Sequence, residues 1–146
     1  MLYAILCYDR EDEVWSWPAE KNAAVMARLD VVQDRLRAEG RLGPVARLVP
    51  TTAAATLRKG AEAMVIDGPF AETKEQLLGF YVVDCATLND AIAVARELGE
   101  AAGTAGAYEL RPLALFRPGA LPEAETYPAG AGPAVGMPPE AGHAPA

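Results

Sequence analysis

The chain has 146 residues, about the length of a single ordinary domain. Hydrophobic residues make up 51% and charged residues 23%, which is typical of a globular protein rather than a disordered or fibrous one. The 20 acidic residues outnumber the 13 basic ones, and this disfavours nucleic-acid binding, which depends on Lys and Arg. No apolar run is long enough to span a bilayer, and the apolar start lacks the basic residues of a secretory signal. We therefore expect a cytoplasmic protein.

Few side chains in the sequence suit metal binding or histidine-based catalysis. The two cysteines, Cys7 and Cys85, have no metal-ligand spacing, and the one histidine, His143, lies close to the C-terminus. A zinc site would need further Cys or His ligands, and a catalytic triad or dyad would need a histidine within the folded domain. We therefore expect no metal and no cofactor.

The composition changes sharply after Phe116. Residues 117–146 contain 7 Pro, 5 Gly and 8 Ala, so two thirds of this segment carries no large apolar side chain. Such a segment cannot offset the entropy cost of ordering by burying apolar surface. The sequence therefore predicts a folded domain over residues 1–116 and a flexible Pro/Gly/Ala-rich tail over residues 117–146.

The first part of the domain predicts a strand, a helix and a second strand. Residues 1–8 are apolar at odd and even positions alike, which indicates a strand buried on both faces. A helix is expected from Pro18, because proline suits the first turn, to Gly40, a typical helix end. A strand is then expected over residues 45–49. The apolar stripe of the helix consists of Val25, Leu29, Val32 and Leu36.

A hairpin and a third long strand follow. Residues 54–59 and 62–67 flank Gly60 and have the pattern of a short hairpin. Residues 77–83 are apolar without alternation, like residues 1–8, and predict another strand buried on both faces.

The domain is expected to end with a helix and a strand. Thr87 and Asp90 have the spacing of a capping box, and the apolar stripe that follows predicts a helix that ends at Gly99 or Gly103. The last strand covers residues 107–116, where Pro112 indicates an edge strand or a bulge.

The predicted order is β-α-β-(hairpin)-β-α-β, the split βαβ arrangement of an α+β, ferredoxin-like fold. In that topology the first and third main strands occupy the centre of the sheet, and these are the two runs without alternation. Two helices are enough to cover one face of a four-stranded sheet. The other face is therefore expected to need a different cover.

The apolar character of that second face predicts a homodimer. Along residues 1–8 one face carries the even-numbered side chains, and along residues 77–83 we expect Leu78, Phe80 and Val82 to oppose Leu77, Tyr81 and Val83. Hiding about 600 Å² per subunit at ~25 cal/mol per Å² corresponds to roughly 15 kcal/mol before the costs of association. A second copy packed sheet to sheet would provide this cover. The tail and the inserted hairpin are the alternative covers.

Residues 67–75 read Asp-Gly-Pro-Phe-Ala-Glu-Thr-Lys-Glu and continue as Gln-Leu-Leu-Gly-Phe-Tyr. This stretch resembles the signature of the DGPF branch of the YCII-related family, and the flanking elements over residues 1–116 fit the same family. The resemblance implies the dimeric α/β-barrel superfamily, in which two ferredoxin-like units join their sheets around a cavity.

The resemblance implies a small-molecule role without fixing a reaction. The wider family includes small-molecule isomerases, dehydrohalogenases and mono-oxygenase-like relatives. Some YCII-like members carry a histidine in the first helix, paired with an aspartate, and the equivalent position here is Leu29. The mechanism of those members is therefore not carried over to this chain.

Within the motif, structural and ligand-binding roles are assigned to different residues. Gly68, Pro69 and Phe70 are expected to fix the loop, with the Phe70 ring buried. Thr73 and Gln76 have capping-box spacing, and a helical turn there would offer N–H groups beside Lys74 to a carboxylate or a phosphate-like anion. The candidate ligand-binding residues are Asp67, Glu72, Thr73, Lys74, Glu75 and Arg111.

Several other residues have two possible roles. Arg111 meets an anionic ligand or pairs with an acid such as Asp67. Trp15 and Trp17, in an acidic loop before the first helix, line a cavity mouth or pack at the edge of a loop or dimer. Tyr81 donates a hydrogen bond into the cavity or packs in the core.

Two functions remain open on the sequence alone. In the first, a homodimeric barrel binds a small, anionic or carbonyl-bearing metabolite, with or without lyase- or isomerase-type acid–base chemistry. In the second, the chain is a non-catalytic regulatory or protein-interaction module that uses the dimer and the tail. The loop with its acids and lysine favours the first function, and the missing histidine favours the second. We expect the first.

Overall fold

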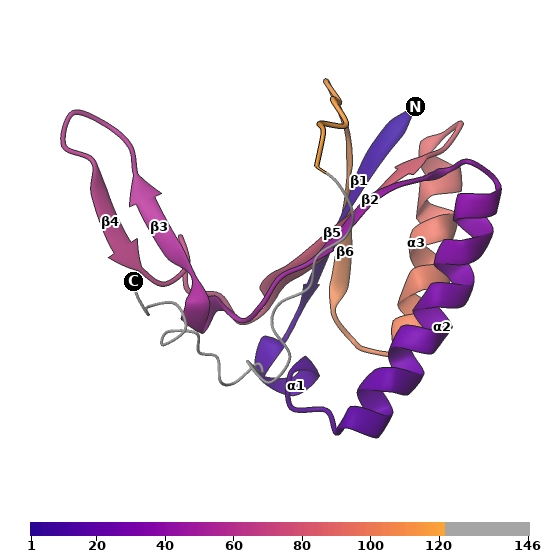
Figure 1. Cartoon of the computed structure of the whole chain (residues 1–146), viewed down its shortest axis with the longest axis horizontal. Coiled ribbons are helices and arrows are strands. Elements are labelled where there is room, and N and C mark those ends of the chain that lie inside the picture. The colour runs from indigo at the N-terminus through magenta and orange to yellow at the C-terminus, as the bar shows by residue number, and fades with distance from the viewer. Residues whose placement is uncertain (122–146) are drawn as a thin grey trace.

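The computed structural model describes residues 1–121, which form a four-stranded antiparallel sheet, a separate two-stranded hairpin and three α-helices. The long helices α2 (Ala19–Ala38) and α3 (Leu88–Ala102) pack side by side on one face of the larger sheet (Figure 1). This is the predicted ferredoxin-like fold, with β1 and β5 at the centre of the sheet. The strands, in the order β2-β5-β1-β6, are β2 (Leu42–Arg47), β5 (Gln76–Asp84), β1 (Leu2–Asp9) and β6 (Ala107–Pro112).

The hydrophobic core lies between this sheet and the two helices. Tyr3 and Ile5 on β1 are at most 2% exposed, and they pair with Val83 and Tyr81 on β5, which are also buried. The buried residues of α2 all belong to the predicted apolar stripe, so helical periodicity identified the face that packs on the sheet. The helices contribute Val25, Leu29, Leu36, Ala91, Val94, Ala95 and Leu98 to the core.

Helix α3 is capped at both ends, as the sequence predicts. The Asp90 N–H donates to Thr87 Oγ1 (3.1 Å), and the Thr87 N–H donates to the Asp90 carboxylate (3.2 Å). Gly103 ends the helix in a left-handed conformation with φ +70°. These contacts satisfy backbone groups that a helix end would otherwise leave without partners.

We expect Thr87→Ala to lower the free energy of unfolding by about 1 kcal/mol, because the Asp90 N–H loses its acceptor. Thr87→Ser keeps the hydroxyl and serves as the matched control. Urea denaturation followed by far-UV circular dichroism measures the difference. Equal midpoints for the alanine and serine variants would contradict a stabilising cap.

The two edge strands differ from their predicted ranges. β2 begins at Leu42 rather than Val45, because its register with β5 shifts and so accommodates the intervening glycine and proline at an edge. It ends at Arg47 rather than Val49. β6 ends at Pro112 rather than Phe116, because its partner strand β1 offers no further residue to pair with. The Leu113 N–H donates to the carbonyl of Leu2, which is already the first residue of β1. The edge position that Pro112 indicated is confirmed.

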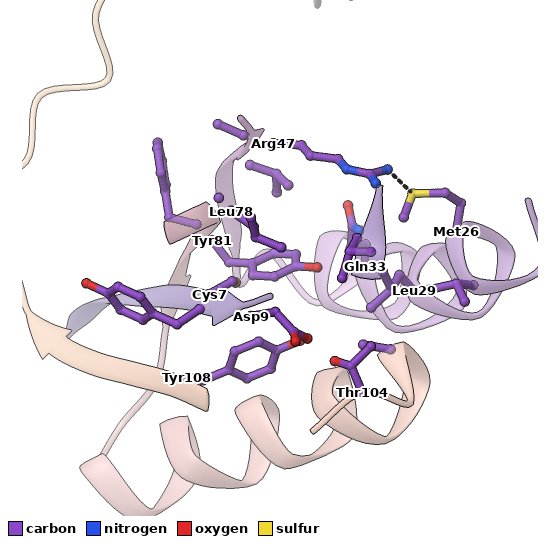
Figure 2. A pocket seen from close by; sticks show the side chains of 18 of the residues that line it. Cys7, Asp9, Met26, Leu29, Gln33, Arg47, Leu78, Tyr81, Thr104 and Tyr108 are labelled. Atoms are coloured by element: carbon purple, nitrogen blue, oxygen red, sulfur yellow. Dashed lines mark hydrogen bonds between the residues drawn. The ribbon is translucent and has the colours of Figure 1, made fainter. Parts of the chain in front are cut away.

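A β-bulge reverses the expected orientation of two leucines. The register of β1 and β5 shifts between Cys7, which pairs with Gly79, and Tyr8, which pairs with Leu77. Leu78 is the additional residue, and its side chain lines the same cavity as Tyr81 (Figure 2). The expectation that Leu77 rather than Leu78 shares a face with Tyr81 is therefore wrong, since alternation is interrupted at a bulge.

The predicted hairpin forms as β3 (Ala55–Arg58) and β4 (Met64–Asp67), after a 3-10 turn η1 (Thr51–Ala53). It stands away from the main sheet, on the side without helices (Figure 1). We call residues 55–67 the arm. Near its base lies a short helix, α1 (Glu11–Val14), where an acidic loop was expected.

The second face of the main sheet carries no helix within residues 1–121 (Figure 1). We call its apolar side chains on β1 and β5 the open sheet face; they are Leu2, Ala4, Leu6, Phe80 and Val82. The predicted flexible tail, residues 117–146, lies outside the described residues except for 117–121. No helix in the described part of the chain is both long and apolar enough to cross a membrane.

Candidate functional site

A cavity of about 160 Å³ lies between the main sheet and α2, and all four strands contribute to its walls. Most of the wall is apolar, with a few convergent polar groups, which is typical of a site for a small molecule. The apolar side chains include Val14, Trp17, Val25, Met26, Leu29, Val45 and Leu78. The polar ones include Cys7, Asp9, Gln33, Arg47, Tyr81, Thr104 and Tyr108 (Figure 2).

Two phenols and a thiol in this cavity stay protonated at neutral pH. Burial raises the pKa of Cys7 to about 12 and the pKa of Tyr81 to about 12. Burial also raises the pKa of Tyr108, and nearby Cys7, Tyr81 and Asp9 oppose formation of its phenolate. Figure 2 draws no hydrogen bond from either phenol hydroxyl to another lining residue. Both hydroxyls are therefore neutral donors that a ligand can use.

Among the lining residues, Arg47 alone carries a positive charge. Its guanidinium lies 4.6 Å from the ring centroid of Trp15, and Nη1 lies 3.4 Å from Asn22 Oδ1 and 3.6 Å from Met26 Sδ. No carboxylate among residues 1–121 forms an ion pair with it. Desolvation lowers the pKa of Arg47, but an arginine remains charged at neutral pH. The cavity thus has a positive charge that these residues do not neutralise.

Asp9 provides the carboxylate of the cavity, at the end away from Arg47 (Figure 2). Its Oδ1 accepts a hydrogen bond from the Arg10 N–H (2.8 Å). In Figure 2 its carboxylate lies close to Tyr108, whereas the Tyr81 hydroxyl points toward Gln33. The site therefore has a cationic end and an acidic end.

None of the six predicted ligand-binding residues lines this cavity. Asp67, Glu72, Thr73 and Glu75 are exposed on the arm and on the loop that follows it. Lys74 borders an open depression together with Arg10 and Asp12, which form an ion pair of 2.7 Å with each other. Arg111 pairs with Glu109 (2.7 Å) on the same strand rather than with Asp67. The six residues are thus not brought together, and their role as ligand contacts stays a prediction.

The loop residues assigned a structural role are partly placed as expected. Gly68 has φ +106°, its N–H donates to the Ala54 carbonyl (2.8 Å), and its carbonyl accepts from the Thr56 hydroxyl (2.8 Å). Pro69 is half-buried beside it. The expected burial of Phe70 is wrong: the ring is 73% exposed and stacks on Arg58 at 5.1 Å, because the loop follows the arm away from the core.

The capping box expected at Thr73 does not form. The Thr73 hydroxyl donates to the Glu75 carbonyl, and the Gln76 side-chain amide donates to the Thr73 carbonyl (2.7 Å). These bonds close a bend and leave no helical turn between the arm and β5. The N–H groups that were expected to hold an anion beside Lys74 are therefore not arranged as a helix N-terminus.

Sequence reasoning identified only part of the cavity. Trp17 and Tyr81 were candidates and line it, whereas Asp9, Arg47 and Tyr108 were missed. One signal for Arg47 was its place as a charged residue within an apolar strand segment. Leu29, the position that the family resemblance equates with the histidine of some members, also lines the cavity with an apolar side chain. Residues 1–121 contain no cluster of three or more His, Cys, Asp or Glu side chains that could hold a metal ion.

Comparisons with known proteins agree with this fold. Residues 1–117 match the YCII-related domain. An uncharacterised protein of Rhizobium meliloti (strain 1021) is 58% identical over 123 residues, which cover 84% of this chain and 99% of that protein. This chain therefore belongs to the YCII-related family.

Proposed function

We propose that the protein binds a small organic carboxylate or carbonyl compound in the cavity between α2 and the sheet. The observation that carries this proposal is Arg47, a cation at the cavity that has no carboxylate partner within residues 1–121. Arginine is well suited to bind a carboxylate through two parallel N–H donors. Trp15 supports this use, because its ring lies against the guanidinium and restricts its position.

The cavity also limits the size and polarity of the ligand. Its volume of about 160 Å³ is close to the roughly 150 Å³ of an apolar protein cavity that holds benzene. A ligand of one ring or a short branched chain therefore fits, with its apolar part against Leu29, Val45 and Leu78. The neutral Tyr81 hydroxyl would donate to the carbonyl or carboxylate oxygen.

The same groups suit acid–base chemistry of the lyase or isomerase type. Asp9 would accept a proton from a carbon next to the carbonyl group, and a phenol would stabilise the negative charge that then develops on oxygen. In an isomerisation Asp9 would return the proton to another carbon of the substrate. This step needs no group beyond those of the cavity.

The proposed assembly is a homodimer formed through the open sheet face. Leu6 and Phe80 pair directly there, and Ala4 and Val82 form the next pair, so apolar side chains of both central strands share this face. Val82 is already buried, but the other side chains of this face are partly exposed. A second copy packed against them would remove that surface from water, the main source of free energy in association.

The ligand proposal predicts that benzoate binds to the full chain and that Arg47→Gln weakens this binding by about 10-fold or more, because a charge-assisted contact is lost. Chemical-shift titration by nuclear magnetic resonance measures the affinity. Arg96→Gln, at an exposed position on α3, is the matched control and should leave it unchanged. Benzyl alcohol, which has no charge, should bind both variants equally. If benzoate shifts no cavity resonance, or binds Arg47→Gln as tightly as the unaltered chain, the proposal is wrong.

A further inference from the structure

The arm carries apolar side chains that lie open on both of its faces. Leu57 and Val65, which pair across the two strands, are 59% and 68% exposed. On the opposite face Met64 is 58% exposed, and Phe70 stacks on Arg58. An isolated two-stranded hairpin is marginally stable in water. Such a hairpin with this much exposed apolar surface is therefore expected to pack on another surface.

Polar contacts at the base of the arm fix its direction. The Glu11 carboxylate accepts hydrogen bonds from the N–H (2.8 Å) and the hydroxyl of Thr51, just before the arm. After the arm, Gln76 Oε1 accepts from the Glu11 N–H (3.0 Å), and Gln76 Nε2 donates to Thr73. Both ends of the arm are thus attached to α1. Figure 1 shows that the arm rises from there on the side of the open sheet face, but apart from it.

The apolar area of the arm adds to the surface that a dimer could bury. Burying one medium-sized apolar side chain removes roughly 60–120 Å² from water, so the partly exposed apolar side chains of the arm and Phe70 offer on the order of 300 Å². The side chains of the open sheet face are already partly covered, and Val82 is only 7% exposed, so this face alone offers less than the roughly 800 Å² that each partner of a standard interface buries. The arm therefore adds apolar contact area that the open sheet face by itself lacks.

We propose that the arm docks on a second copy of this chain, at the rim of that copy's open sheet face. This inference rests on the proposed dimer. Twofold symmetry forms each contact twice, and one chain contains both halves of the contact, the apolar arm and the apolar sheet face. Each arm then covers apolar surface of its partner while its own Leu57 and Val65 are buried.

The test is sedimentation equilibrium of the full chain with the double substitution Leu57→Lys and Val65→Lys. Both positions are largely exposed, so the subunit should stay folded, which circular dichroism checks. We expect the dimer dissociation constant to rise by about 100-fold or more, because two charges are placed in an apolar contact. The added lysines also reduce the net charge of −7, so weaker association cannot come from greater repulsion between subunits.

A matched control and a second variant separate the two proposals. Val31→Lys with Ala93→Lys adds the same charge at exposed helix positions and should leave the dimer unchanged. Leu6→Asp places a charge on the open sheet face and should dissociate the dimer. If Leu6→Asp dissociates the dimer and the arm variant does not, docking of the arm is wrong and the sheet dimer stands. If the unaltered chain sediments as a monomer at every concentration, both proposals are wrong.

Discussion

Gly79→Ala is expected to lower the free energy of unfolding by about 3 kcal/mol, at the upper end for added volume in a packed site. A Cβ at this position would lie 2.3 Å from the Ala46 carbonyl oxygen and 3.1 Å from the Arg47 Cα, both backbone atoms of β2. Backbone in a strand pair cannot move aside as a flexible side chain can. β2 would therefore have to separate from β5 near the bulge.

The same substitution should also weaken ligand binding, because Ala46 and Arg47 form one wall of the cavity. Urea denaturation gives the stability change, and benzoate titration under conditions where the variant remains folded gives the affinity. Gly99→Ala is the matched control: its Cβ, on α3, would meet only Tyr108 Cε2 of β6 at 3.7 Å, an ordinary van der Waals contact. Alanine is the better helix former, so that control should be neutral or stabilising. A Gly79→Ala protein as stable as the control would contradict the tight packing of β2 on β5.

The topology could be predicted because it depends on patterns that local sequence contains. Residues 1–8 and 77–83 lack alternation, and the structure places both at the centre of the sheet. The cap of α3 could also be predicted, since its two hydrogen bonds join the side chains of Thr87 and Asp90 to each other's backbone, three residues apart. Such features require no knowledge of what the rest of the chain does.

The errors arose where a residue's place depends on a distant element. Leu78 changes sides because one residue is added opposite Cys7, and nothing within residues 77–83 shows that insertion. Phe70 was expected in the core because it is aromatic, but the loop that carries it follows the arm. The direction of the arm depends in turn on Glu11, which is remote in sequence.

The candidate site shows the same limit more strongly. The conspicuous motif, residues 67–75, lies at the end of the arm and in the loop that follows it. The cavity instead assembles residues from all four strands of the main sheet and from α2. Asp9, Arg47 and Tyr108 lie far apart in the chain and belong to no short motif. Only the strand register brings them to one end of the sheet. A close resemblance in a short segment therefore identified the family but not this cavity.

Stability is expected to fall steeply above pH 9 because of the three protonated groups in the cavity. The pKa of Cys7 rises from 9.0 to about 12 and that of Tyr81 from 10.0 to about 12 on folding, and the pKa of Tyr108 rises as well. Below pH 9 both the folded and the unfolded chain keep these protons, so the groups add no pH dependence there. At higher pH the unfolded chain releases protons that the folded chain retains, and unfolding becomes more favourable.

Each such group lowers the free energy of unfolding by about 1.4 kcal/mol per pH unit once it has titrated in the unfolded chain alone. With three groups the slope approaches roughly 4 kcal/mol per pH unit, so by pH 12 the loss is comparable to a typical total stability of about 5–15 kcal/mol. Urea denaturation at a series of pH values measures this slope. Tyr81→Phe should reduce it by about one third, because one of three titrating groups is removed.

The control for this prediction is Leu29→Ala, which opens space in the same cavity without removing a titratable group. It should lower stability by about 2–5 kcal/mol at every pH and leave the slope unchanged. A slope that is equal in Tyr81→Phe and in the unaltered chain would show that the phenol is not held in its neutral form by burial. Tyr81 would then be open to water rather than buried in the apolar cavity that the proposed ligand site requires, so the alkaline titration tests the surroundings of this phenol without any ligand.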